Sequence, residues 1–448
     1  VKHYAANNQE TRRMSNSSEV SERALQEIYL PAFRAAVEQA DAWSIMAAYN
    51  ALNGVAACEN PDLLRDKLRG EYGFRGFVVS DWFAVRRTSS AEASIRAGLT
   101  LEKPGKGSRY RHKNLRRAFE QGLFSEAELD QNLVDLLRVM VLTGHLDSAG
   151  PPGQRNTPEH QALAREMAEA GITLLKNEGA LLPLDPARVM KVALVGPRLK
   201  RRNCLPLWGG SAGVWPPYEI TPWKGLQAEN RGRFQWVKSP AEADVVLLFV
   251  GVSHRPGFDS EAMDRKYLGL PPDQQALIRK TVAATPTTVV ILTNGGPLSM
   301  PWLDSVPAVL ETWYPGMEGG SAIARAVFGD INPSGKLPVT FPKQLEDSPA
   351  HASPRTYPGD KHRVYYDEEL LVGYRYFDRR GVEPLFPFGH GLSYTRFEYG
   401  EPGLNGDRFS DGDTLRLSMV LRNIGARAGA EVVQLYVADH QAAEDRPP

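Results

Sequence analysis

Short apolar runs alternate with amphipathic stretches along the first third of the chain. Each run breaks into polar or aromatic residues, and the runs cover residues 43–52, 76–80 and 97–102. The intervening stretches place apolar residues at helical spacing, which predicts helices over residues 18–40, from Asn60 onward, and over 114–121 and 125–145. A polar segment at residues 2–10 marks the end of a further strand. Strands that alternate with helices indicate a (β/α) barrel or a doubly wound sheet.

A Pro/Gly-rich segment at residues 147–157 predicts a linker, after which the pattern changes. The following strands are near-continuous apolar runs, at residues 191–196, 243–251, 288–294 and 308–312. Such runs are typical of strands buried on both faces of a parallel sheet. With a helix predicted over residues 272–284, this segment is predicted to form an αβα sandwich with a mainly parallel sheet. The glycines at 209–210 match no phosphate-binding motif and are interpreted as a tight turn.

The last segment has the pattern of an exposed β-sheet. Residues 412–423 alternate apolar and polar side chains, as a strand with one exposed face does. A β-sandwich is the fold that accommodates such strands, and part of one is predicted here.

Composition narrows the classes of function. The chain has 448 residues, 42% of them hydrophobic, with 53 acidic and 53 basic side chains. Zero net charge argues against a general nucleic-acid binder, and no apolar run is long enough to span a membrane, so a soluble protein is expected. Cys58 and Cys204 are far apart and show no metal-ligand spacing, so neither a zinc site nor a disulfide framework is predicted. The compartment stays open between periplasmic, secreted and cytoplasmic.

The first candidate for chemistry is Asp81, which directly follows the apolar run at residues 76–80. Residues just past the C-terminal end of a barrel strand face the substrate pocket. The alternative is that Asp81 caps the next helix. Trp82 offers an apolar face on which a ligand ring can stack, or else packs in the core. Lys2 and His3, at another strand end, suit a hydroxyl-rich ligand.

The second candidate is Glu261, in a polar loop at residues 252–265. Two alternatives stay open: Glu261 pairs with Arg265 one helical turn away, as a surface contact, or Asp259 is the functional carboxylate of this loop. His390 is interpreted as a structural hydrogen-bonding residue.

Several motifs in this order resemble the family 3 glycoside hydrolases, especially their bacterial β-glucosidase-like members. They are Lys2-His3-Tyr4, residues 23–33, Ser80-Asp81-Trp82, residues 171–177 and residues 384–394. Residues 261–265 are similar to the family's Glu-Gly-x-Asp-Arg element, with Ala262 in place of the usual glycine. The resemblance implies Asp81 as nucleophile and Glu261 as acid/base, and two carboxylates with different duties are what glycoside hydrolysis needs. It also implies six substrate-binding residues, namely Lys2, His3, Arg13, Met46, Tyr49 and Trp82, with no cofactor and no metal.

The resemblance implies an α/β protein with three parts. We expect the C-terminal half of a (β/α)8 TIM-like barrel at residues 1–146, a linker at 147–157, and the αβα sandwich at 158–345. A connecting segment at 346–395 would lead to part of a fibronectin type III-like β-sandwich at 396–448, in which residues 432–437 resemble a middle strand. Val1 would lie near the fifth barrel strand, so a missing segment or companion chain would supply the first half of the barrel. A homo-oligomer is a further possibility.

The expected activity is that of a retaining, exo-acting β-glucosidase, with a small carbohydrate as its partner and neither nucleic acid nor membrane. A β-xylosidase of the same family is the nearest alternative. An inactive carbohydrate-binding fragment that lacks half its barrel is an alternative of a different class. A phosphate-dependent transferase is disfavoured, because Glu261 matches a hydrolase-type acid/base.

Overall fold

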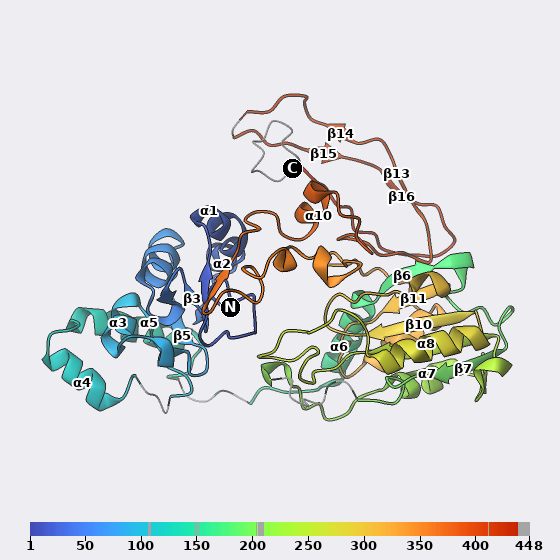
Figure 1. Cartoon of the computed structure of the whole chain (residues 1–448), viewed down its shortest axis with the longest axis horizontal. Helices are drawn as coiled ribbons and strands as arrows, with labels where there is room; N and C mark the ends of the chain where they lie inside the picture. Colours follow the sequence, from blue (N-terminus) through green and yellow to red (C-terminus); the bar gives the residue numbers. More distant parts are fainter. Residues whose placement is uncertain are drawn as a thin grey trace.

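The computed structural model describes residues 1–105, 109–147, 150, 152–202, 204, 210–410 and 412–437. Three groups of elements are separated in space (Figure 1). The first region, residues 1–147, lies opposite a larger sheet region that begins after residue 157, and the last strands lie apart from both. Residues 346–395 run between these groups.

Four strand segments of the first region lie side by side in parallel. Strand β2 (Ser44–Ala47) pairs in parallel with β5 (Phe77–Ser80). Single parallel bridges extend this pair on both sides, from Tyr4 to Ala47 and from Val79 to Leu101. The four segments therefore follow one another in chain order, as the alternation of apolar runs predicts. Helices η3 (Asp62–Glu71), α3 (Ala91–Ala97), α4 (His112–Glu120) and α5 (Glu126–Leu142) complete the region.

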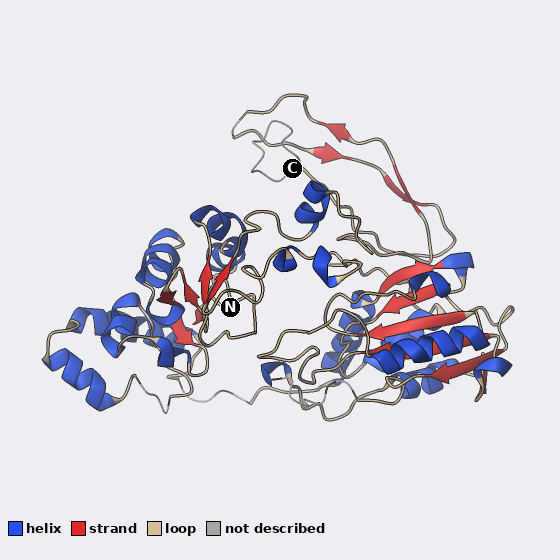
Figure 2. Cartoon of the chain, in the orientation of Figure 1, coloured by secondary structure: helices blue, strands red, loops and turns tan. Residues whose placement is uncertain are grey.

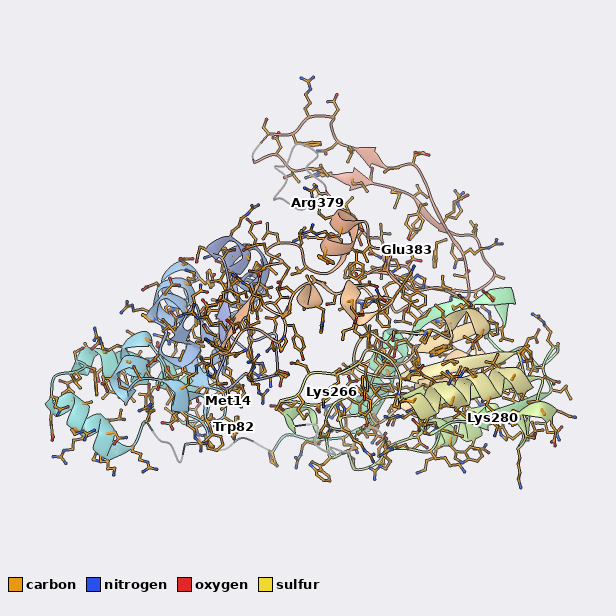
Figure 3. The ribbon with its side chains drawn as sticks, viewed as in Figure 1. Met14, Trp82, Lys266, Lys280, Arg379 and Glu383 are labelled. Carbon is orange, nitrogen blue, oxygen red and sulfur yellow. The ribbon has the colours of Figure 1, made fainter. Side chains whose placement is uncertain are left out.

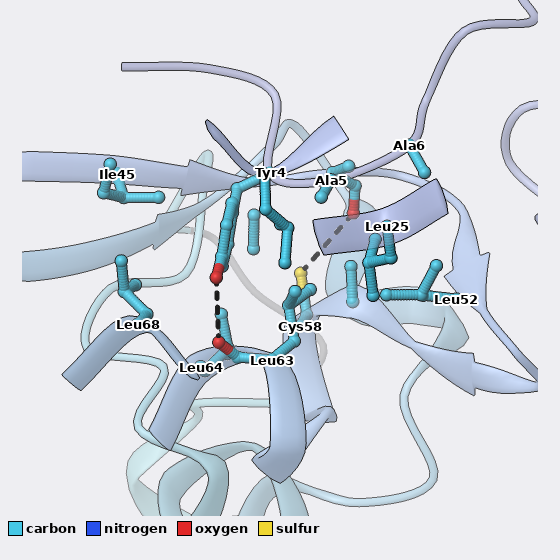
Figure 4. Packing of buried hydrophobic residues seen from close by; sticks show 14 of the residues in the cluster. Tyr4, Ala5, Ala6, Leu25, Ile45, Leu52, Cys58, Leu63, Leu64 and Leu68 are labelled. Carbon is cyan, nitrogen blue, oxygen red and sulfur yellow. Dashed lines mark hydrogen bonds between the residues drawn. The ribbon is translucent and has the colours of Figure 1, made fainter. Parts of the chain in front are cut away.

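The core of the first region forms between these strands and helix η3. Tyr4, Ile45, Leu63 and Leu68 are almost completely buried in it. Figure 4 shows Tyr4 packed over this helix, and its hydroxyl donates a hydrogen bond to the Leu63 carbonyl at 3.1 Å. This packing fixes the residues next to Tyr4, including His3.

The single helix predicted over residues 18–40 is wrong at its start. Residues 17–19 form strand β1 (Ser17–Glu19), which pairs in parallel with β12 (Arg363–Tyr365) and β3 (Ala51–Leu52). Pairing with a distant segment overrides the local helical spacing. The helix begins after Ser21, whose side chain accepts the Ala24 N–H. It continues as α1 (Glu22–Ala24), η1 (Leu25–Tyr29) and α2 (Pro31–Glu38), while β4 (Val55–Ala56) completes the four-stranded sheet.

The second region is a six-stranded sheet between helices, hereafter the sandwich (Figure 2). Its strands, in spatial order, are β6 (Thr173–Asn177), β11 (Ala308–Glu311), β10 (Thr288–Thr293), β9 (Val245–Gly251), β7 (Lys191–Val195) and β8 (Gln235–Val237). All neighbours are parallel except β6 and β11, which confirms the prediction of a mainly parallel sheet. Strands β6 and β8 were not among the four apolar runs that predicted this sheet.

Helices cover both faces of this sheet. Leu247 and Phe249 pack with α6 (Pro158–Gly171), α7 (Pro222–Asn230) and α9 (Gly319–Phe328). The alternate residues Leu248 and Val250 pack with Ile278 of α8 (Pro272–Ala284). Both faces of β9 are therefore buried, which is the physical reason for its unbroken apolar run.

The connecting segment holds β12, α10 (Tyr374–Arg380) and short 3₁₀ turns. His390 lies in it, and its ring Nε2 is hydrogen bonded to the Leu175 carbonyl at 2.8 Å, which confirms the structural interpretation.

Cys58 and Cys204 are both free thiols. In the described part of the chain, no helix is long and apolar enough to cross a membrane.

The last segment forms two small antiparallel pairs. Strand β13 (Phe397–Tyr399) pairs with β16 (Leu421–Asn423), and β14 (Gly403–Leu404) pairs with β15 (Leu417–Ser418). The alternating stretch thus forms two short strands instead of one. The strand predicted at 432–437 is not formed, because among the described residues no strand pairs with it. Residues 438–448 of the predicted β-sandwich lie outside the described residues.

Candidate active site

One cavity of about 550 Å³ gathers all eight residues that the sequence predicts for the site. It lies between the strand ends of the first region and loops of the sandwich. Figure 3 shows Trp82 and Met14 on the side of the first region that faces the loop carrying Lys266. The lining residues are Lys2, His3, Arg13, Met46, Tyr49, Asp81, Trp82, Gly210, Ser211, Glu261 and Ala262.

Asp81 is a buried carboxylate at the C-terminal end of β5. Its backbone N–H continues the ladder to Ala47 O at 3.0 Å, and its Oδ1 accepts the Trp82 N–H at 2.7 Å. The next helical turn, η4 (Ala84–Arg87), has Phe83 as its N-cap and no side-chain cap, so the helix-capping interpretation of Asp81 is wrong. The second oxygen, Oδ2, lies 3.4 Å from His3 Nε2.

Two neighbours respond to the Asp81 carboxylate. Burial raises the pKa of Tyr49, and the charge of Asp81 raises it further, because the Tyr49 hydroxyl is hydrogen bonded to this carboxylate. Burial lowers the pKa of His3, and the attraction of Asp81 offsets only part of that effect. His3 is therefore a neutral imidazole at neutral pH, able to donate or accept a hydrogen bond.

Glu261 enters the cavity from the sandwich side. Its Oε1 accepts a hydrogen bond from Arg13 Nη2 at 2.8 Å, and its Oε2 accepts the Ser211 N–H at 2.5 Å and Oγ at 3.0 Å. Burial alone would raise the pKa of Glu261, but these bonds to Arg13 and Ser211 outweigh it and hold the pKa at about 2. In this state Glu261 is ionised.

The local pairing of Glu261 with Arg265 is not formed. Arg265 instead bonds the Asp259 carboxylate and donates to Pro297 O at 2.7 Å. The other oxygen of Asp259 accepts Tyr314 OH at 2.6 Å and Gly295 N–H at 2.7 Å. Asp259 is therefore an anchor of the 252–265 loop, and it is not part of the cavity lining.

Trp82 lines the cavity with an exposed aromatic ring, and Arg13 lines it with a mostly buried cation. Trp82 is 47% exposed, so the interpretation of this residue as a core aromatic is wrong. The Arg13 guanidinium lies 4.5 Å from the centre of the Tyr49 ring, and its Nη1 donates to Glu10 Oε2 at 2.7 Å. Arg13 thus bridges two carboxylates from different parts of the chain.

The arrangement places two carboxylates in contrasting surroundings on one cavity. Asp81 lies deep at a strand end beside neutral donors, whereas Glu261 is held by a cation and a serine. In the part of the chain that the structure describes, no cluster of three His, Cys, Asp or Glu has metal-binding geometry.

Comparison with known families covers most of the chain. Residues 1–139 match the model of the glycosyl hydrolase family 3 N-terminal domain, and residues 172–394 match the model of the family 3 C-terminal domain. The chain belongs to glycoside hydrolase family 3. Asp81 lies within the first match and Glu261 within the second.

Sequence relatives match the whole chain, and a solved structure matches nearly all of it. The chain is 38% identical to a thermostable beta-glucosidase B of Acetivibrio thermocellus, over 100% of this chain and 60% of that protein. It is 31% identical to a beta-glucosidase of Rhizobium radiobacter, over 100% of this chain and 74% of that protein. The structure of beta-glucosidase 3B from Thermotoga neapolitana in complex with alpha-D-glucose superposes with a TM-score of 0.85 at 33% identity, over 96% of this chain and 65% of that chain. The chain spans 60–65% of the length of the first curated relatives it matches.

The structure adds residues to this family 3 site that the sequence patterns did not single out. Ser211 contacts Glu261 across 50 positions, and Gly210 packs so tightly that a Cβ there would lie 1.9 Å from Glu261 Oε2. Glu10 joins through Arg13, and Asp264 accepts the backbone N–H groups of residues 10 and 11 at 3.1 and 2.8 Å. Two local signals were present, namely the Glu10-x-x-Arg13 spacing and the place of Asp264 in the element at residues 261–265. The other contacts join distant segments.

Proposed function

We propose that the protein is a retaining β-glucosidase that releases terminal non-reducing β-D-glucose from oligosaccharides or glucosides. The observation that carries this proposal is that Asp81 and Glu261, from separate regions, line one cavity with the six predicted sugar-binding residues. Membership of family 3 and relatives named as beta-glucosidases support it.

In the first step the Asp81 carboxylate attacks the anomeric carbon while Glu261, carrying a proton, donates it to the leaving oxygen. The bond between Asp81 and the sugar forms as the glycosidic bond breaks. Lys2 and His3 would bind sugar hydroxyls, and Trp82 would offer a face for the ring or the leaving group. Tyr49, through its hydrogen bond, keeps the Asp81 carboxylate oriented.

In the second step water replaces the aspartyl ester. Glu261 takes a proton from the water, whose oxygen attacks the anomeric carbon as the bond to Asp81 breaks. The ionised state of Glu261, held by Arg13 and Ser211, is the form needed here. The first step requires the opposite state, so Arg13 needs another partner whenever Glu261 holds a proton.

We also propose a fold for the first region. The four parallel strand segments would be the C-terminal half of a (β/α)8 barrel, with the site at their C-terminal ends. Exposed apolar side chains on α4 and α5, including Phe119, Leu133, Leu137 and Val141, support a further packing partner for this region. We propose that additional strands, in a longer polypeptide or a companion chain, complete the barrel. Residues from 396 onward would belong to a fibronectin type III-like domain.

The test is hydrolysis of aryl β-glucosides by the full-length protein, with aryl β-xyloside in parallel. Asp81→Asn is expected to abolish turnover, and Asp66→Asn, at an exposed surface pair, serves as the matched control. Glu261→Gln is expected to lower kcat/KM about 10²–10⁴-fold for an alkyl glucoside. It should lower kcat/KM much less for a 2,4-dinitrophenyl glucoside, whose leaving group needs no proton. NMR of the first-formed sugar should show the β-anomer. The α-anomer, or full activity of Asp81→Asn, would refute the proposal.

A further inference from the structure

Arg13 is shared between two carboxylates of the cavity region. Its Nη1 donates to Glu10 Oε2 at 2.7 Å and its Nη2 to Glu261 Oε1 at 2.8 Å. The Arg13 side chain is only 12% exposed. Burial of this guanidinium is therefore tolerated because both carboxylates compensate its charge, and together they raise the pKa of Arg13 although burial opposes them.

Glu10 also contacts the loop that carries Glu261. Its Oε2 accepts the N–H of Ala262, the residue after Glu261, at 2.5 Å. The Glu10 backbone N–H in turn donates to Asp264 Oδ1 at 3.1 Å. One residue of the first region thus holds both the cation that pairs with Glu261 and the backbone beside it.

A proton on Glu261 changes this balance. It removes the negative charge from one side of Arg13, and a mostly buried cation without a counter-ion is costly. Glu10 remains as the partner that keeps Arg13 paired in that state. The other charged or titratable groups around the cavity that face Glu261 are Lys2, His3, Tyr49 and Asp81.

We propose that Glu10 is a positioning residue for the acid/base step, keeping Arg13 paired while Glu261 carries a proton and holding Ala262 so that Glu261 faces the cavity. This inference rests on the proposed role of Glu261. Glu10 itself transfers no proton in this scheme. When Glu261 gives its proton to the leaving oxygen, the new carboxylate pairs with Arg13 again.

The test compares Glu10→Gln with the unmodified full-length protein on two substrates, methyl β-glucoside and 2,4-dinitrophenyl β-glucoside. Without the Glu10 charge, Arg13 acts on Glu261 alone, so Glu261 loses its proton at lower pH. The basic limb of the kcat/KM profile for methyl β-glucoside is expected to move down by about one pH unit, which is about a tenfold loss on that limb. The value for 2,4-dinitrophenyl β-glucoside should change less than about twofold.

The ratio of the two kcat/KM values does not depend on the fraction of folded enzyme, so partial misfolding cannot imitate the result. Glu27→Gln, which removes a carboxylate from an exposed pair with Arg23, is the matched control and should leave both profiles unchanged. An unshifted basic limb, or equal losses with both substrates, would overturn the role of Glu10. No turnover of either glucoside by the unmodified protein would overturn the proposed function itself, and the role of Glu10 with it.

Discussion

Gly210→Ala is the sharpest test of how the site holds Glu261. Gly210 has a φ of +60°, and an added Cβ would lie 1.9 Å from Glu261 Oε2 and 2.6 Å from its Cβ and Cδ. Contacts this short do not persist, so the Glu261 side chain must move by about 1 Å. The left-handed conformation adds a separate strain of about 1–2 kcal/mol for any residue with a Cβ.

The two effects are separated by a matched variant. Gly232 has a φ of +78°, and a Cβ added there would have no heavy atom within 4 Å, so Gly232→Ala carries the strain without the collision. A misplacement of about 1 Å in a catalytic group can cost about 10²-fold. We therefore expect Gly210→Ala to lower kcat/KM for methyl β-glucoside by about 10²-fold, and Gly232→Ala to leave it unchanged.

The assay is kcat/KM for methyl and 2,4-dinitrophenyl β-glucosides, with thermal unfolding of both variants measured alongside. In the proposed mechanism only the methyl glucoside needs a proton from Glu261, so the loss of kcat/KM in Gly210→Ala should be concentrated in that substrate. The reasoning is refuted if Gly210→Ala keeps kcat/KM within twofold of the unmodified protein. It is also refuted if Gly232→Ala loses as much activity, since strain alone would then explain both.

Three further changes test other parts of the structure. Burial raises the pKa of Glu311 to about 8, so between pH 5 and 8 the folded state keeps a proton that the unfolded chain releases. The unfolding free energy therefore falls as the pH rises through this range. Glu311→Gln should flatten that fall, as measured by urea unfolding at several pH values. Asp264→Asn removes the charged acceptor of the backbone N–H groups of residues 10 and 11. It should lower kcat/KM about tenfold and speed the hydrogen exchange of those two amides. Unchanged exchange would contradict the contact. Gly225→Ala places a Cβ 1.9 Å from Gly320 O where α7 meets α9, so thermal unfolding should show a loss of about 1–3 kcal/mol in unfolding free energy. Gly171→Ala, where an added Cβ meets no heavy atom within 4 Å, is the control and should not show this loss.

The strands that the sequence predicts best are those buried on both faces. The apolar run at β9 follows directly from helices packing on each side of it. Strand β1 was missed because its ladder joins Ser17–Glu19 to Arg363–Tyr365, and no local pattern encodes a partner so far along the chain. The run at 432–437 shows the converse, since strand propensity without a paired neighbour yields no ladder.

The residues of the candidate site also divide into those with a local sequence signal and those without one. Asp81 was a candidate from its place after an apolar run, and Glu261 from its motif, because both signals are local. The partner of Glu261 was not predicted: helical spacing favoured Arg265, whereas the structure pairs Glu261 with Arg13, 248 positions away. Arg265 was unavailable because Asp259, Tyr314 and the 295–297 turn form a separate network around it.

The proton affinity of Glu261 is consequently set from outside its own loop. Arg13 comes from the first region and Ser211 from another loop of the sandwich, and these two hold the pKa of Glu261 at about 2. Looser docking between the regions would return that pKa toward its ordinary value, whereas loss of the Glu10 charge alone would lower it. The pH dependence of the first chemical step should therefore report how the two regions are docked. Changes at Asp264 and at Glu10 would move it in opposite directions, although both residues hold the same pair of loops together.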